Sequence, residues 1–189
     1  MKQIKSALKK AGFTDIIEVA KGADITTKHE AKEFSHRISN CEPFMTTSCC
    51  AGYNELVKKH IPELKPYVSE TETPLFYTAE LVKQNNPNAI TVFISPCVAK
   101  RSEVKENPNI DYLLNFEELD ALLTGRDIEL SECEEEELDN TISRYGRNYG
   151  ISGGVAAAVK KASKDEDSVK ICHINGLNKE NIKVLKKYM

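Results

Sequence analysis

Two adjacent thiols, Cys49 and Cys50, end an apolar, β-branched stretch at residues 44–47, and Gly52 follows at once. The pattern predicts a short strand that stops at the thiols and a helix that starts near Gly52. A thiol at such a junction lies near partly positive backbone N–H groups, which make it a better ligand or nucleophile. Because successive side chains of an extended segment point to opposite faces, we expect one thiol to be a ligand and the other to act beside it.

A second group of reactive side chains follows the most apolar strand that the sequence predicts, residues 89–95. Cys97, Lys100 and Glu103 stand close together directly after it. A lysine donates hydrogen bonds to an anionic ligand, and a glutamate can carry a proton. Alone, Cys97 would be a small buried hydrophobe. With a cation and a carboxylate beside it, we interpret it as part of a site.

Two other chemistries are weaker alternatives. Structural zinc sites usually contain close pairs such as C-x2-C, and the sequence has none. A catalytic cysteine with a histidine partner stays open, but an isolated histidine is more often an ordinary surface or core residue. Nothing in the sequence singles out one of the four histidines, His29, His36, His60 and His173.

Length and composition are those of a globular protein. The 189 residues allow one domain with a real core, and 40% are hydrophobic and 29% charged. The net charge of −3 is too small for a nucleic-acid partner, and no apolar run is long enough for a membrane span. We predict a cytoplasmic protein, in which the six cysteines are thiols, metal ligands or catalytic groups rather than disulfides.

Helical and strand patterns alternate along the chain. The predicted helices cover residues 1–10, 23–39, 75–84, 117–123, 155–162 and 179–188, and the strands 15–20, 44–47, 89–95, 111–116 and 169–174. The run 132–137 is expected as a solvated acidic loop, and Ser152 as a helix N-cap. Alternation predicts an open α/β fold with a mostly parallel sheet and flanking helices. Since ligands bind beyond the carboxyl ends of such strands, we expect Cys50 and Cys97 to converge on one pocket near Lys100 and Glu103.

From about Lys5 to its last helix, the chain resembles the catalytic domain of the iron-only (di-iron) hydrogenases. The family motifs T-S-C-C-P-x-W/F, P-C-x-x-K-x-x-E and T/S-G-G-V are similar to residues 47–53, 96–103 and 152–155. The family's A-P segment ahead of the first helix and its C-terminal C-x-x-x-C segment have no counterpart in the sequence. The resemblance therefore implies that residues 1–189 are a partial iron-hydrogenase-like domain.

In that family four cysteines hold a 4Fe-4S cubane, which bridges to a di-iron centre with CO, cyanide and azadithiolate ligands; together they form the H-cluster. By position, the resemblance implies Cys50 and Cys97 as two cubane ligands and Cys49 as the proton donor. It implies that Glu103, Ser69 and Glu33 continue the proton route. It also implies a cofactor pocket lined by Lys100, which would bind a cyanide, and by Ser152, Gly153 and Ser95.

Two of these assignments have ordinary alternatives, an exposed helix position for Glu33 and a simple turn role for Ser69. The remaining cysteines match no family ligand, and we interpret them as structural: Cys41, Cys133 and Cys172.

The implied activity is the reversible reduction of protons to H₂ with electrons from a ferredoxin or ferredoxin-like domain. Because only two cubane ligands stand at motif positions, we expect the chain alone to hold no complete cluster and to evolve no hydrogen. It would be a fragment, or a half-site completed by the remainder of the domain. The alternative is a non-catalytic iron–sulfur sensor or regulatory domain, which Ser95 and Ala51 favour, since the hydrogen-evolving enzymes carry Met and Pro there. A thiol-dependent enzyme with Cys49 as nucleophile has little support.

Overall fold

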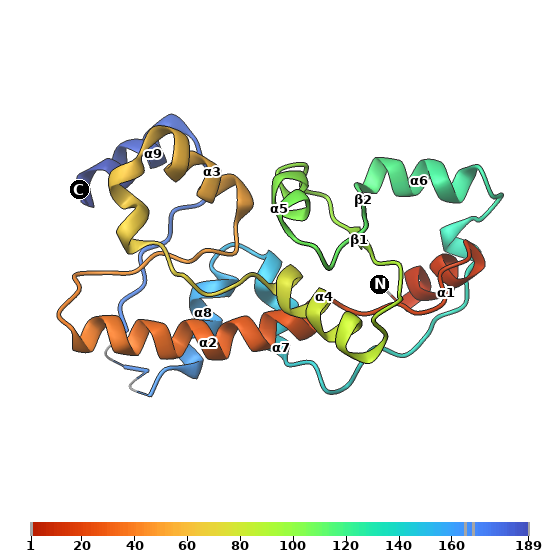
Figure 1. Cartoon of the computed structure of the whole chain (residues 1–189), viewed down its shortest axis with the longest axis horizontal. Coiled ribbons are helices and arrows are strands. Elements are labelled where there is room, and N and C mark those ends of the chain that lie inside the picture. The colour runs from red at the N-terminus through yellow and green to blue at the C-terminus, as the bar shows by residue number, and fades with distance from the viewer. Residues whose placement is uncertain (1, 165, 168, 189) are drawn as a thin grey trace. The chain divides into compact units, whose positions relative to one another are not determined.

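The computed structural model describes residues 2–164, 166–167 and 169–188. Its internal contacts divide the chain into two units (Figure 1). The first unit is Met1–Val19 with Thr78–Thr141, and the second is Ala20–Tyr77 with Ile142–Met189. Among the described residues, none of the helices combines the length and the apolar character that a membrane crossing requires.

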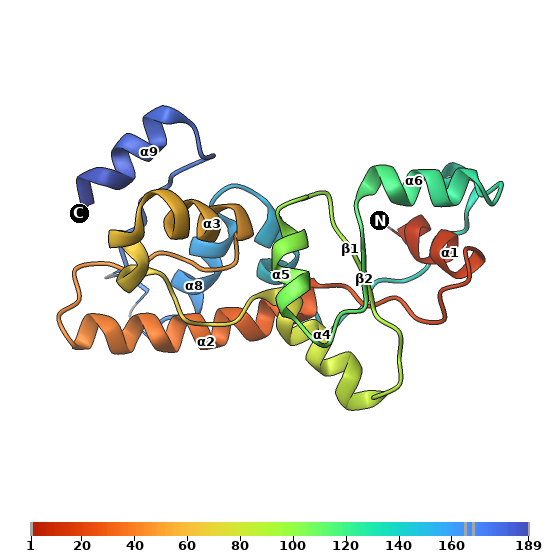
Figure 2. The ribbon, with the colours of Figure 1, turned by 45° about the horizontal axis from the view of Figure 1, so that its top comes forward.

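The first unit contains a parallel β-α-β arrangement. Strands β1 (Val92–Ile94) and β2 (Tyr112–Leu114) lie side by side (Figure 2), with Val92 opposite Tyr112. Parallel neighbours need a crossover, which contains α5 (Lys100–Glu106). The crossover places the segment with Cys97 directly after β1, at the carboxyl end of the sheet.

Two helices form the core of the first unit. Helix α1 (Lys2–Lys10) packs against α6 (Phe116–Thr124), which begins in a capping box where Asn115 and Glu118 satisfy each other's backbone N–H groups. Helix α4 (Pro74–Asn85) begins in the second unit and ends in the first. The buried core residues of the first unit are Ala7, Leu8, Ala11, Leu119, Leu123 and Cys133.

The acidic run after η2 (Leu130–Glu132) is a loop, as predicted, but it has cationic partners. Lys2 and Lys9 of α1 lie 3.4 and 2.6 Å from carboxylate oxygens of Glu135 and Glu136. Exposed ion pairs of this kind contribute little to stability, so their effect is mainly to align the loop with the helix.

The second unit is organised around its longest helix, α2 (Ala20–Ser39), beside which α8 (Gly154–Ala162) lies in Figure 1. The short α7 (Arg144–Arg147) and η3 (Asn148–Gly150) also belong to this group. A Cβ atom on Gly146 would stand only 2.6 Å from the Ala20 carbonyl oxygen. Glycine is therefore required for the close approach of α7 to α2.

A second group of elements in this unit surrounds an apolar cluster. Helices α3 (Ala51–His60), η1 (Pro62–Tyr67), α9 (Lys179–Leu185) and η4 (Lys186–Tyr188) lie here. Phe44 stacks on Tyr67 with ring centroids 4.4 Å apart. The buried members of this cluster are Val57, Ile61, Leu64 and Leu185.

Helices α1 and α2 end in the same way. The Phe13 N–H donates to the Leu8 carbonyl at 3.1 Å, and the Glu42 N–H donates to the Arg37 carbonyl at 3.1 Å. Both bonds close a turn whose intervening residue is left-handed, Gly12 with φ 99° and Cys41 with φ 63°. Glycine adopts this conformation freely, whereas in Cys41 the Cβ atom makes it sterically unfavourable.

The α/β fold class predicted from the sequence is confirmed. The structure is mostly helical, with a small parallel sheet. The predicted strands at 15–20 and 169–174 are wrong, because these segments have no ladder partner and α2 already begins at Ala20. The segment 44–47 contributes only a single parallel bridge, between Thr46 and Val68. Ser152 is not the N-cap of α8; that position is Gly153, whose φ is 78°.

Candidate functional site

The two adjacent thiols lie at a loop-to-helix junction in the second unit. Cys50 is the N-cap residue of α3, with extended backbone and an exposed side chain, whereas Cys49 is half-buried. The hydroxyl of the preceding Ser48 is buried and donates to the Thr71 carbonyl at 2.7 Å. The Asn54 amide donates to the Ser48 carbonyl at 2.7 Å. The backbone before the thiols is therefore held from two sides.

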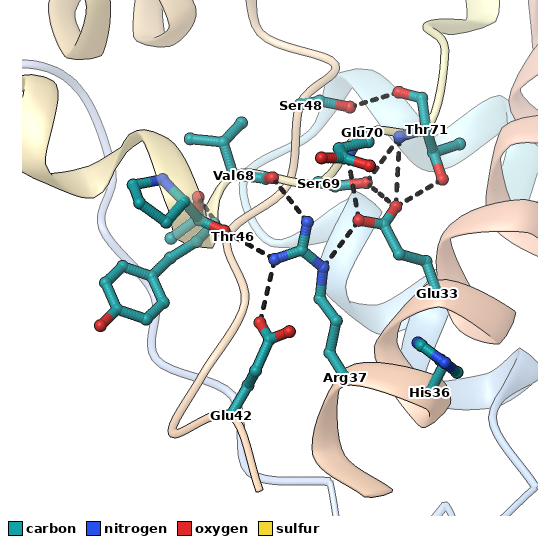
Figure 3. A network of polar contacts seen from close by, with 12 residues as sticks. Glu33, His36, Arg37, Glu42, Thr46, Ser48, Val68, Ser69, Glu70 and Thr71 are labelled. Carbon is teal, nitrogen blue, oxygen red and sulfur yellow. Dashed lines mark hydrogen bonds and ion pairs between the residues drawn. The ribbon is translucent and has the colours of Figure 1, made fainter. Parts of the chain in front are cut away.

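Glu33 on α2 is the centre of a polar network in the same unit (Figure 3). Its Oε2 atom accepts hydrogen bonds from the hydroxyls of Ser69 at 2.6 Å and Thr71 at 2.8 Å. The backbone N–H groups of Glu70 and Thr71 donate to the same carboxylate at 2.9 and 3.1 Å. Burial raises the pKa of Glu33, but the hydrogen bonds, led by that of Ser69, outweigh it and lower the pKa below 4.5. Glu33 is therefore charged at neutral pH.

Arg37, one turn along α2, connects this carboxylate to the segment before Ser69. Its Nε donates to Glu33 Oε1 at 2.8 Å, and its Nη1 donates to the Pro66 carbonyl at 2.7 Å (Figure 3). Nη2 donates to the Val68 carbonyl at 3.2 Å. The planar fork of a guanidinium suits this set of acceptors in a way that a lysine ammonium does not. The bonds fix the 66–71 segment against α2.

Glu30, one turn before Glu33, is a functional candidate that the sequence interpretation missed. Its side chain is fully buried, and neither carboxyl oxygen has a hydrogen-bonding partner. Burial raises the pKa of Glu30 to about 7; the charge of Glu33 adds to the rise, and the Ser48 backbone and the Ser69 hydroxyl oppose it. A carboxyl group with this pKa exchanges protons near neutral pH. The sequence did contain a signal: Glu30 lies on the face of α2 that carries small residues such as Ala23 and Thr27, one turn before Glu33.

The other predicted residues lie in the first unit. Lys100 and Glu103 form an ion pair on consecutive turns of α5, with 15% and 18% of their side chains exposed. Ser95 is buried, and its hydroxyl accepts the Cys97 N–H at 3.3 Å. The Cys97 side chain is exposed. Because Cys50 and Cys97 belong to different units, their convergence on one pocket stays a prediction.

The structure connects two of the residues on the proton route that the resemblance implies. Ser69 and Glu33 are in direct contact, and Ser69 is buried rather than an exposed turn residue. Glu103 has Lys100 as its ion-pair partner and belongs to the other unit. Its link to Ser69 and Glu33 therefore rests on the resemblance alone.

The turn at Ser152 and Gly153 has a second neighbour, His173. A Cβ atom on Gly153 would lie 2.3 Å from His173 Cε1, so the imidazole ring rests directly on the glycine backbone. Gly153 also has a left-handed φ of 78°. Both observations make glycine obligatory here, while the Ser152 side chain is exposed.

The donor set can be compared with the needs of an iron–sulfur cubane. Exposed thiols such as Cys50 and Cys97 are the right kind of ligand, and a cubane takes about four thiolates. Within the described part of the chain, no group of three or more His, Cys, Asp or Glu side chains is arranged to hold a metal ion. The two thiols thus fit a cubane in chemistry, and they supply part of the required number.

Comparisons with known proteins agree on one family. A profile described as the iron only hydrogenase large subunit, C-terminal domain, matches residues 1–188. The chain is 31% identical over 182 residues to iron hydrogenase 1 of Clostridium pasteurianum, covering 86% of this chain and 32% of that protein. It is 29% identical to the periplasmic iron hydrogenase large subunit of Nitratidesulfovibrio vulgaris, covering 81% and 41%.

Solved structures give the same result. An FeFe-hydrogenase structure that reports stepwise H-cluster assembly matches with a TM-score of 0.70 and 31% identity, covering 85% of this chain and 45% of that one. A variant FeFe-hydrogenase from Chlamydomonas reinhardtii matches with a TM-score of 0.71 and 30% identity, covering 85% and 46%. The chain thus spans 32–46% of the length of these relatives.

Proposed function

Because the chain belongs to the iron-only hydrogenase large-subunit family, we propose that it serves the reversible reaction in which two protons and two electrons form H₂. When bound, the 4Fe-4S cubane and the di-iron centre supply the electrons and the metal at which protons are reduced. The electrons would come from a ferredoxin-type donor. The residues of this chain would bind the metal centre and deliver protons to it.

The observation that carries the proposal is the set of proton-carrying groups around Glu33 on α2. Ser69 donates to Glu33 at 2.6 Å, and the buried Glu30 lies one helical turn away on α2. Proton relays need groups within hydrogen-bonding distance and with a pKa near the working pH. Glu30 has such a pKa, of about 7, because of its burial.

The roles that we propose follow from these properties. Cys49 gives up a proton toward the metal centre, Glu30 resupplies it, and Ser69 links Glu30 to Glu33. Glu33 is charged and lies at the network's more exposed end, so it takes up protons from outside. Glu103 keeps its proposed place on the route, with Lys100 as its ion-pair partner.

The metal ligands and pocket residues complete the proposal. Cys50 and Cys97 are the proposed cubane ligands. Lys100 would donate hydrogen bonds to a cyanide, and Ser95, Ser152 and Gly153 would line the pocket. Since only Cys50 and Cys97 stand at the family's ligand positions, we propose that the chain alone holds no complete cubane.

Iron and sulfide analysis after anaerobic reconstitution tests the ligand assignment. We expect well under four irons per chain, and about four when a polypeptide that carries a C-x-x-x-C thiol pair is added. Cys50→Ser and Cys97→Ser are expected to prevent this gain, whereas the control Cys41→Ser is expected to permit it. Four irons on the chain alone, or a full gain in both ligand variants, would contradict the assignment.

The proton route is tested in the assembled, cluster-loaded protein. Glu33→Gln keeps the size of the side chain and removes its charge, so we expect hydrogen evolution to fall about 10²-fold or more. Glu63→Gln is the control, because Glu63 is exposed on η1 and outside the network. Equal turnover in the two variants would remove Glu33 from the route.

A sensor or regulatory domain is the second candidate, favoured by Ser95, where the hydrogen-evolving relatives carry Met. The Ser95 hydroxyl accepts the Cys97 N–H, so this residue shapes the turn of the proposed ligand. A sensor is expected to gain the cluster on complementation and still to release no hydrogen with a reduced viologen dye. Rapid release would exclude it.

A further inference from the structure

Tyr149 places a hydroxyl group beside the proposed proton route. It belongs to η3, next to α2, and its Oη lies 3.3 Å from Thr27 Oγ1. The Thr27 hydroxyl also lies 2.8 Å from the Ala23 carbonyl oxygen. A threonine hydroxyl has one proton and cannot donate to both. When Thr27 donates to Ala23, Tyr149 must donate to Thr27; when Thr27 donates to Tyr149, the tyrosine proton is available elsewhere.

Glu30 is the neighbouring group that lacks a partner. It lies one helical turn after Thr27, and both of its oxygens are buried without a hydrogen bond. Glu33 faces it from the same helix, and Ser48 and Ser69 face it from the adjacent loops. Unpartnered buried carboxyl oxygens are costly, so a polar group that can turn toward them stabilises the charged form.

We propose that Tyr149 is a positioning residue for Glu30, and that its hydroxyl, supported by Thr27, turns toward the carboxyl group when Glu30 is charged and toward Thr27 when Glu30 is neutral. The Thr27–Tyr149 pair then reverses its direction of donation with each proton that Glu30 gains or loses. The inference builds on the proposed proton route, where Glu30 holds a proton between transfers.

Tyr149 itself stays protonated in this scheme. Burial raises its pKa far above the ordinary value, the Thr27 hydrogen bond opposes the rise, and the charges of Glu30, Cys49 and Asp24 add to it. It therefore supplies an orientable hydroxyl group and no titrating charge. A hydrogen bond to a carboxylate is stronger than one to a neutral acid, so the hydroxyl favours ionised Glu30. Its removal is expected to raise the pKa of Glu30.

The test is an NMR titration of side-chain carboxyl carbons in the full chain without metal, with Glu30→Gln to assign the signal. We expect Tyr149→Phe to raise the pKa of Glu30 by about one unit. Tyr53→Phe is the matched control, because the Tyr53 hydroxyl donates to Thr46 Oγ1 at 2.9 Å elsewhere in the same unit. It is expected to leave the pKa of Glu30 unchanged.

Two threonine variants keep the test decisive if Tyr149→Phe folds poorly. Thr27→Val removes the oxygen that accepts the Tyr149 proton while Glu30 is neutral, so the hydroxyl is free for the carboxylate and the pKa of Glu30 is expected to fall, whereas Thr27→Ser retains that oxygen and is expected to cause no shift. An unchanged or lowered pKa of Glu30 in Tyr149→Phe, or an unchanged or raised one in Thr27→Val where that variant decides, overturns the inference. The titration needs no hydrogen turnover, so its failure is distinct from the loss of the proposed route in Glu33→Gln.

Discussion

At the scale of single residues, α2 carries two carboxyl groups, one turn apart, whose pKa values are shifted in opposite directions. Glu33 has donors on both oxygens and a lowered pKa, whereas Glu30 has no partner and a raised one. Their difference comes first from burial, which raises the pKa of Glu30, and then from hydrogen bonding, which outweighs burial at Glu33. A pair of carboxyls whose environments separate their pKa values is the arrangement that proton-transfer sites use.

The two carboxyls give opposite pH dependences of the unfolding free energy. Glu30 has a folded pKa of about 7 against an ordinary 4.5, so the folded state binds more protons between these values and loses stability as pH rises from about 5 to 8. The loss is on the order of 3 kcal/mol. We expect Glu30→Gln to remove this slope in urea unfolding followed across that range.

Glu33 acts in the other direction. Its folded pKa is lowered, so its contribution is present above the ordinary pKa of 4.5 and is lost as pH falls below it. Glu33→Gln is expected to reduce the acid-side loss of stability and to leave most of the slope between pH 5 and 8 in place, because burial is the main cause of that slope and the charge of Glu33 a smaller one. A common effect of both variants on the two slopes would contradict the assignment.

Arg37 is the residue whose geometry matters most for the network. Arg37→Lys keeps the charge and loses the fork that reaches Glu33 and the Pro66 and Val68 carbonyls, so we expect a loss of about 1–2 kcal/mol in urea unfolding. Arg101→Lys is the control. Its ion pair with Glu118 is half-exposed, and the change is expected to stay within about 0.5 kcal/mol.

At the scale of elements, the ends of α1 and α2 share one geometry with different residues. Cys41 takes the left-handed position that Gly12 occupies in α1. Cys41→Gly is expected to stabilise the protein by about 0.5–1 kcal/mol, because it relieves the backbone conformation. Cys41→Ala removes the thiol and keeps the strain, so its midpoint in urea is expected to match the unchanged protein. A gain in both variants would assign the effect to the thiol.

The elements that could be predicted from the sequence are those whose signals are local. The helices over 117–123 and 155–162 were found because apolar periodicity and turn residues mark them, and β1 lies within the predicted 89–95. The strand assigned to 15–20 failed because a short apolar run does not reveal whether a partner strand exists. Helix α5 was missed because its sequence is almost entirely polar.

The residues of the candidate site also separate into those that local sequence patterns predict and those that depend on distant contacts. The positions of Cys49, Cys50 and Cys97 at element ends followed from local patterns and were confirmed as loop positions next to helices or strands. The contact between Ser69 and Glu33 came only from the family resemblance, because 36 residues separate them. Glu30 was missed because the burial of a carboxyl group depends on packing by residues distant in the sequence, which no local pattern contains.

At the scale of the whole molecule, each unit has its own hydrophobic cluster. Leu64 is fully buried in the second unit and Leu8 nearly so in the first, so we expect Leu64→Ala or Leu8→Ala to cost about 2–5 kcal/mol in its own unit. Hydrogen exchange measured by unit is expected to show that each variant reduces protection mainly around its own cluster. Equal loss in both units would show a single cooperative core.

The second unit contains every residue of the Glu33 network, whereas the proposed cubane ligands are divided between the units. The groups of the Glu33 network can therefore be ordered before any metal centre is complete. The cytoplasmic location, the ferredoxin-type donor and the convergence of the two cysteines stay predictions at this scale.

The donors around Glu33 include the backbone amides of Glu70 and Thr71. Each of these amides should be strongly protected from exchange with deuterated solvent, relative to its intrinsic rate at the same pH, while the carboxylate is charged, and less protected once acid neutralises it. Two peptide protons, both visible without any iron in the protein, would thus report the protonation of Glu33.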